Sequence, residues 1–189
     1  GYELGGSYEN VQTVESYGGG VGQVSTTLYN AVILAELEIT QRSNHSMIVS
    51  YVKPSMDAAI AGDYKDLRFV NNQDIPIYIE GYTEGKNVTF KIYGHDTRPS
   101  NRVVTYESEV VSEQDPGTQY VATGDPAGYM KPAQGKHIGY VARLWNLVTV
   151  DGVEESREIF NKSTYKASPK IVNVGTASAD PNLTAVIGA

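Results

Sequence analysis

A run of glycines leading straight into an apolar segment constrains this chain more than any other stretch. Glycine occupies positions 18, 19, 20 and 22, and the segment Gln23-Val24-Ser25-Thr26-Thr27-Leu28-Tyr29 follows. Glycine lets the backbone bend sharply and approach a ligand closely. Leu28, Val32 and Ala35 then recur at helical spacing, which predicts a largely buried helix over residues 26–37. Ser25 and Thr26 are the candidate N-cap residues.

The start of such a helix is electropositive, because its first N–H groups have no acceptor inside the helix. The site therefore suits an anion, a thiolate or an oxyanion. The known phosphate-loop patterns are missing, since no Gly-x-Gly-x-x-Gly follows a strand and no Lys-Ser/Thr follows the glycines. A nucleotide site is thus disfavoured, while a ligand loop and a purely structural tight turn both remain open.

The first half of the chain, residues 1–96, is predicted to be α+β, with one buried helix against an antiparallel sheet. Apolar patterns predict strands over residues 47–52, 67–69, 75–79 and 88–93. Pro76 places the third of these at a sheet edge or makes it a strand start. The run Glu84-Gly85-Lys86-Asn87 predicts a hairpin loop between the last two strands. Residues 1–17 are expected to be irregular or strand-like.

The second half, residues 97–176, is predicted to be a small all-β domain, and its boundary with the first half lies within a polar, turn-rich linker at residues 94–101. Strands are expected over residues 103–111, 140–150, 153–160 and 171–175, with a loop-rich stretch over residues 117–135. Asp151-Gly152 lies between the two longest runs, and this dipeptide is a strong hairpin signal. Residues 177–189 are expected to form a poorly ordered tail.

Composition excludes several classes of function. The 189 residues carry a formal net charge of −7, which argues against a nucleic-acid binder because that class needs a basic face. No apolar run is long enough to span a membrane. The absence of cysteine excludes disulfides and thiolate metal sites and fits an extracellular bacterial protein. The chain begins in mid-pattern without a signal peptide, so a fragment of a longer anchored or secreted protein is expected.

Residues 18–31 resemble the signature of the VanW family of bacterial cell-envelope proteins. The likeness continues through Asn44-His45-Ser46 and Asp57-Ala58-Ala59, and then through residues 64–69, 71–72 and 76–79. It covers about residues 8 to 94. One departure stands out, because the family carries a cysteine between Val21 and Gln23, where this chain has Gly22.

The resemblance implies cysteine acyl transfer of the L,D-transpeptidase type on peptidoglycan stem peptides. Position 22 is then the nucleophile position, and a thiolate there would benefit from the helix start. His45 is the implied base, since His95 falls in the linker and His137 in the second half. The loop at Gly19 and Gly20 would receive the oxyanion, with Gln23, Ser25 and Thr26 shaping that region. No metal and no cofactor are expected.

The residue that would orient the imidazole stays open between Asn44 and Ser46, with Asp57 as a further possibility. For Asp57 and Asp66, binding of stem-peptide amino groups is weighed against capping of turns, and capping is preferred. A metal site made of His45, Asp57 and Asp66 is disfavoured because no ligand spacing supports it. The alternative for His45 itself is a structural turn histidine.

Residues 101–176 resemble the G-five (G5) domain, a small all-β extracellular module, through Gly135, Gly139, Gly152 and Gly175. This resemblance implies adhesion, with N-acetylglucosamine-containing glycans as ligand. Two hypotheses follow: a catalytic protein of the bacterial cell wall that is inactive because glycine replaces the nucleophile, or a non-catalytic envelope protein that binds glycan or peptide. Gly22 is explained by an engineered change, by a natural inactive member, or by a family role that needs no thiol.

Overall fold

The computed structural model describes residues 4–9 and 12–178. Its first half contains β1 (Leu4–Glu9), β2 (Gln12–Tyr17), α1 (Val21–Leu34), β3 (Glu38–Gln41), β4 (Arg68–Val70), β5 (Tyr78–Glu84) and β6 (Asn87–Tyr93). Its second half contains β7 (Arg102–Gln114), β8 (Thr118–Pro126), β9 (Met130–Gln134), β10 (Gly139–Val150), β11 (Val153–Tyr165) and β12 (Lys170–Ala177). The predicted order, an α+β region and then an all-β region, is confirmed.

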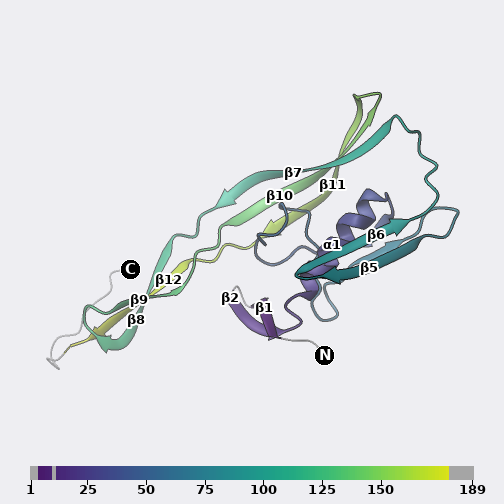
Figure 1. The fold of residues 1–189 in the computed structure, drawn as a ribbon. Coiled ribbons are helices and arrows are strands. Elements are labelled where there is room, and N and C mark those ends of the chain that lie inside the picture. Colours follow the sequence, from purple (N-terminus) through teal and green to yellow (C-terminus); the bar gives the residue numbers. More distant parts are fainter. Residues whose placement is uncertain (1–3, 10–11, 179–189) are drawn as a thin grey trace.

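The molecule is elongated, with α1 and the β5–β6 hairpin towards one end and β8, β9 and β12 at the other (Figure 1). The strands of the first half form three antiparallel pairs, β1–β2, β3–β4 and β5–β6. The turn Gly85-Lys86 closes the β5–β6 hairpin, as predicted, and β5 begins after Pro76 because proline cannot donate to a strand ladder.

Helix α1 begins earlier than predicted. Gly20 is its N-cap residue and no side chain caps it, so the prediction of Ser25 and Thr26 as caps is wrong. Both hydroxyl groups lie inside the helix and are buried, where they bond to the Ala58 backbone. The glycines allow this early start because Gly18, at a φ of 85°, turns the chain directly into the helix, a conformation that glycine adopts without strain.

Residues 47–52 form no strand, which corrects that prediction. Met47 and Val49 are buried, but Tyr51, the next residue on the same predicted face, is exposed, so the alternation does not persist over the predicted strand. Among the described residues no strand pairs with the backbone of this segment, and its apolar pattern reflects the burial of Met47 and Val49 in the core. The opposite difference occurs at residues 117–135. The sequence predicts a loop there, whereas the structure has β8 and β9, which pair with β12 on either side.

The second half contains two three-stranded sheets, ordered β11-β10-β7 and β8-β12-β9. The Asp151-Gly152 turn joins β10 to β11 as predicted, and both residues have positive φ values, 52° and 78°. Gly175 is required on β12, because a Cβ there would collide with the Pro126 carbonyl oxygen. The predicted tail beyond residue 178 lies outside the described residues.

One hydrophobic cluster joins the two halves of the chain. Tyr29 and Ile33 of α1 pack with Ala58 and with Leu144 of β10, and all four are buried. Tyr106 of β7 also donates its hydroxyl to the Ile33 carbonyl oxygen at 2.9 Å. The first sheet of the second half is therefore part of the platform that holds the helix and the loops around it.

Candidate functional site

The glycine loop and the first turn of α1 form one wall of the site. Gly18 has a φ of 85°, a conformation that glycine adopts without strain, and its carbonyl oxygen accepts the Val21 N–H at 2.9 Å. The Gly20 carbonyl oxygen accepts the N–H of Gln23. Among the described residues, the N–H groups of Gly19, Gly20 and Gly22 donate to no backbone carbonyl. These are the amides left to meet a ligand.

Position 22 faces His45. Gly22 lies in the first turn of α1, and not before the helix as the sequence suggested. A Cβ built on Gly22 would lie 2.6 Å from His45 Nε2 and 3.5 Å from the Tyr51 hydroxyl. A side chain at position 22 would thus contact the imidazole directly, and the ring would have to move back slightly to admit it.

Asp57 holds the other side of the imidazole. Its Oδ2 lies 2.7 Å from His45 Nδ1 and accepts the His45 backbone N–H, also at 2.7 Å. An ionised carboxylate only accepts hydrogen bonds, so the Nδ1 atom carries a proton. The other ring nitrogen, Nε2, faces position 22 and lies 3.4 Å from the Tyr51 hydroxyl. The sequence prefers capping for Asp57, but its carboxylate accepts from the distant residues His45 and Arg42, which is the arrangement expected of an orienting residue.

The Asp57 carboxylate is buried and almost fully bonded. Its Oδ1 accepts the Arg42 guanidinium at 3.0 Å and the Tyr165 hydroxyl at 2.5 Å, and its side chain is 1 % exposed. Burial by itself raises the pKa of Asp57, but the hydrogen bonds from His45 and the charge of Arg42 outweigh it and hold the pKa below its ordinary value. The carboxylate therefore stays ionised beside the imidazole.

The other predicted orienting residues have different partners. Asn44 Nδ2 donates to the His45 and Thr164 carbonyl oxygens, and Ser46 Oγ accepts from Lys65 at 3.3 Å. Ser25 and Thr26 both bond the Ala58 backbone, so they tie the helix to the segment that carries Asp57, and the Ser25 hydroxyl also lies 3.1 Å from the Gly22 carbonyl oxygen.

Asp66 lies apart from the site. It accepts the Leu67 N–H and pairs with Arg68 at the surface, which is the turn-stabilising role that the sequence favoured for it.

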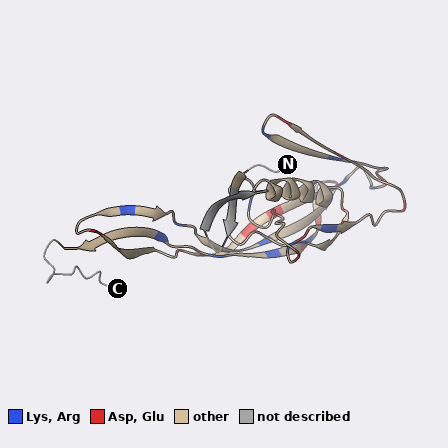
Figure 2. Cartoon of the chain, turned by 90° about the horizontal axis from the view of Figure 1, so that it is seen from below, with Lys and Arg blue, Asp and Glu red and all other residues tan. Residues whose placement is uncertain are grey.

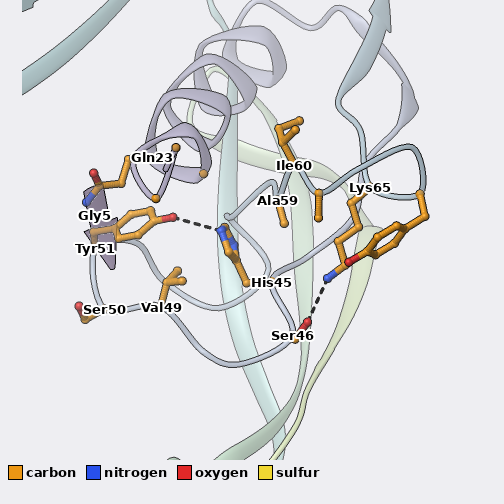
Figure 3. Close-up of a pocket in the computed structure, with 16 residues that line it drawn as sticks. Gly5, Gln23, His45, Ser46, Val49, Ser50, Tyr51, Ala59, Ile60 and Lys65 are labelled. Carbon is orange, nitrogen blue, oxygen red and sulfur yellow. Dashed lines mark hydrogen bonds between the residues drawn. The ribbon is translucent and has the colours of Figure 1, made fainter. Parts of the chain in front are cut away.

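These elements line a pocket of about 530 Å³. Figure 3 shows His45 between Tyr51 on one side and Lys65 with Ser46 on the other. Of the predicted residues, Gly19, Gly20, Gly22, Gln23, His45 and Ser46 line it. Tyr51, Tyr64 and Lys65 also line it but received no role from the sequence. Tyr64 and Lys65 belong to a stretch that was recognised only for its resemblance.

No three His, Asp or Glu side chains gather into a metal-binding group anywhere in the described ranges. Over those same ranges, α1 is too short and too polar to be a membrane-spanning helix. Lys and Arg are interspersed with Asp and Glu along the strands (Figure 2).

The depressed pKa of Asp57 predicts a specific loss of stability in acid. Above the ordinary value of 3.8 the carboxylate is ionised in both the folded and unfolded chain, and its bonds contribute fully to stability. Below 3.8 the unfolded chain takes up a proton first, so this contribution is lost as pH falls towards the lower folded pKa. We expect Asp57→Asn (D57N) to lose less thermal stability than the parent chain between pH 5 and pH 2.

Calorimetry or circular dichroism melting over this range checks that expectation. Asp66→Asn is the comparison. The hydrogen bond from Arg68 also lowers the pKa of Asp66, but this pair lies at the surface where water screens it, so D66N should relieve much less of the acid sensitivity than D57N. Parallel pH curves for the parent chain and D57N would contradict the assignment of this acid sensitivity to Asp57.

Comparison with known proteins finds a matching family model for each half of the chain. Residues 1–93 match the family model described as VanW like protein, and residues 102–177 match the model of the G5 domain. Over 82 residues the chain is 42% identical to the uncharacterized protein YoaR of Bacillus subtilis strain 168. That alignment spans 43% of this chain and 27% of YoaR, so the chain corresponds to only part of that relative's length.

Two solved structures resemble the second half. The G5 domain of an IgA1 protease is 25% identical, with a TM-score of 0.31, over 41% of this chain and 94% of that domain. The HP0197-G5 structure is 16% identical, with a TM-score of 0.24, over 39% of this chain and 95% of that one.

Proposed function

This chain joins a VanW-family region to a G5 domain, and on that premise we propose that its first region is built for cysteine acyl transfer on peptidoglycan stem peptides. Both domain types are typical of cell-envelope proteins. The observation that carries the proposal is the line from position 22 through His45 to Asp57, with 2.6 Å between a Cβ at position 22 and Nε2 and 2.7 Å between Nδ1 and Oδ2. This order of nucleophile, base and carboxylate is the arrangement that activates a thiol.

With cysteine at position 22, the chemistry balances as two acyl transfers. His45 Nε2 takes the thiol proton, and the thiolate attacks a carbonyl carbon of the donor stem peptide. The tetrahedral oxyanion faces the glycine-loop amides, and its collapse expels the terminal D-residue, whose amine takes the proton from His45. An amine of a second stem peptide then attacks the thioester, loses a proton to His45 and releases the thiol.

Asp57 supports both steps without exchanging a proton itself. It keeps the Nδ1–H tautomer, so Nε2 remains the base, and its charge stabilises the imidazolium that forms in each transfer. Glycine at position 22 supplies no nucleophile, so the chain as it stands is expected to bind a donor peptide and not to turn it over. Restoring cysteine at this position is the direct test of the proposal.

The pocket suits a donor that carries a free carboxylate. Its lining includes Lys65 and His45 and, among the described residues, no Asp or Glu. Lys65 Nζ donates to the Asn44 carbonyl oxygen at 2.8 Å and to Ser46 Oγ, which leaves one of its three N–H donors for a ligand. Burial lowers the pKa of Lys65, and the nearby Asp57 charge opposes this effect.

We expect Lys65→Met (K65M) to weaken binding of an N-acetylated peptide that ends in a free D-alanine carboxylate by about 10-fold, the loss typical of one charge-assisted hydrogen bond. Isothermal titration calorimetry measures this on the Gly22 chain, which cannot consume the peptide. The same peptide with a C-terminal amide should bind the two chains equally. Lys91→Met is the matched control, since Lys91 is exposed on β6. Equal carboxylate affinities for the parent chain and K65M would contradict this assignment.

The absence of a nucleophile favours a second candidate, a non-catalytic envelope protein. In that case the same pocket only recognises a stem peptide, and the G5 domain holds the protein on N-acetylglucosamine-containing glycan outside the cell. The two candidates differ in one result. A restored cysteine forms an acyl adduct with a muropeptide in the first and stays free in the second.

A further inference from the structure

The G5 domain contributes contacts to the residues around the site. Tyr165 ends β11 and is 2% exposed. Its hydroxyl donates to Asp57 Oδ1 at 2.5 Å and accepts the Ser55 N–H at 2.7 Å. A tyrosine more than a hundred residues further along the chain thus bonds the carboxylate that orients His45, and also the backbone two residues before it.

The residues next to Tyr165 reinforce this attachment. Arg42, which pairs with Asp57, donates its other terminal nitrogen to Ser163 Oγ at 2.8 Å. Asn44 Nδ2 donates to the Thr164 carbonyl oxygen at 2.9 Å, and the Lys166 N–H donates to the Ser46 carbonyl oxygen at 2.7 Å. Residues 163–166 are therefore bonded along residues 42–46, the segment that carries His45.

The division of bonds on Asp57 shows what Tyr165 contributes. Oδ2 takes both donors of His45, while Oδ1 takes Arg42 and Tyr165. A rotation of the carboxylate away from the ring would break the bonds on Oδ1 as well. Burial raises the pKa of Tyr165, so its hydroxyl keeps its proton at neutral pH and remains a donor.

We propose that Tyr165 is a positioning residue of the VanW site, so that the G5 domain completes the site and is more than an attachment module. The consequence for catalysis rests on the proposed function, whereas the effect on His45 does not. The Tyr165 hydroxyl holds the Asp57 carboxylate in place, the carboxylate fixes the Nδ1–H tautomer of the His45 imidazole, and the imidazole faces position 22. The VanW region without β11 would lack the hydrogen bond from Tyr165 to Asp57.

The chain offers a matched pair of variants. Tyr165→Phe (Y165F) removes the hydroxyl at Asp57. Tyr106→Phe (Y106F) removes another hydroxyl that bridges the two halves, because Tyr106 bonds the Ile33 carbonyl oxygen away from the pocket. Y165F loses two hydrogen bonds, to Asp57 and from the Ser55 N–H, and Y106F loses the bond to Ile33. Each variant therefore weakens a contact between the two halves of the chain, and a general loosening of that contact would show in both. Only Y165F touches the site.

The first readout is proton NMR of the full Gly22 chain. The His45 Nδ1 proton should give a low-field, slowly exchanging signal, assigned by its loss in His45→Gln. We expect Y165F to lose this signal to solvent exchange and Y106F to keep it. If Y165F does not fold, 3-fluorotyrosine at position 165 keeps the hydroxyl but makes it a stronger donor, and it should shift the signal.

The second readout uses the same variants in a Gly22→Cys background. Alkylation of the thiol by iodoacetamide at pH 6 should slow by about 10-fold or more with Y165F, because a misplaced base loses its effect steeply with distance, and by less than about 2-fold with Y106F. An unchanged Nδ1 signal in Y165F, or its equal loss in Y106F, overturns the inference. A lost Nδ1 signal together with a thiol that never forms an acyl adduct keeps the positioning role and rejects acyl transfer.

Discussion

Replacing Gly22 with cysteine (G22C) is expected to create a thiol that iodoacetamide alkylates at least about 10-fold faster at pH 6 than an ordinary surface cysteine. The sulfur would lie in the first turn of α1 and against His45 Nε2, and both surroundings favour the thiolate. With muropeptides, the same variant is expected to give an acyl-enzyme adduct and cross-linked dimers by mass spectrometry.

The natural control is a cysteine two residues earlier. Gly20 belongs to the same loop, has an ordinary φ of −78°, and a Cβ there meets nothing within 4 Å. Gly20→Cys therefore adds the same thiol to the same electropositive loop without the imidazole. A double variant that combines G22C with His45→Gln should fall to the rate of the Gly20 cysteine. Equal alkylation rates at positions 20 and 22, and no adduct from a folded G22C chain, would leave the binding candidate as the better account.

Removing the buried carboxylate is expected to have the largest effect on folding. Asp57→Ala (D57A) leaves the Arg42 guanidinium, the Tyr165 hydroxyl and the His45 N–H groups without their shared acceptor. Loss of one partner of a buried ion pair typically costs about 3–5 kcal/mol of the free energy of unfolding. The cost is high because these donors are buried and water cannot replace the carboxylate.

Urea denaturation followed by the fluorescence of Trp145 measures this change. Trp145 is the single tryptophan of the chain and lies on β10, in the sheet that packs on α1. Asp66→Ala is the control, since Asp66 pairs with Arg68 at the surface and its removal should leave the denaturation midpoint almost unchanged. A D57A midpoint as high as that of the control would show that the network around Asp57 contributes little to folding.

Several features of this protein could be predicted from local sequence signals. The Asp151-Gly152 turn, the long strands on either side of it and the β5–β6 hairpin depend on residues next to one another in the chain. The errors occurred where burial and pairing depend on distant partners. The sequence of residues 47–52 alternates like a strand, but no strand in the described part of the chain pairs with it. β8 and β9 form in a glycine-punctuated stretch because β12 lies between them.

The sequence by itself determined that a glycine loop opens the helix, that position 22 holds no nucleophile, and that His45 is the histidine that precedes the linker. Only the tertiary structure decided that the Asp57 carboxylate bonds this imidazole, that Ser25 and Thr26 bond the Ala58 backbone, and that Tyr165 of the second half bonds Asp57. The reason is physical. A capping signal or a turn is encoded within a few residues, whereas a buried carboxylate takes its donors from whichever segments the fold brings around it.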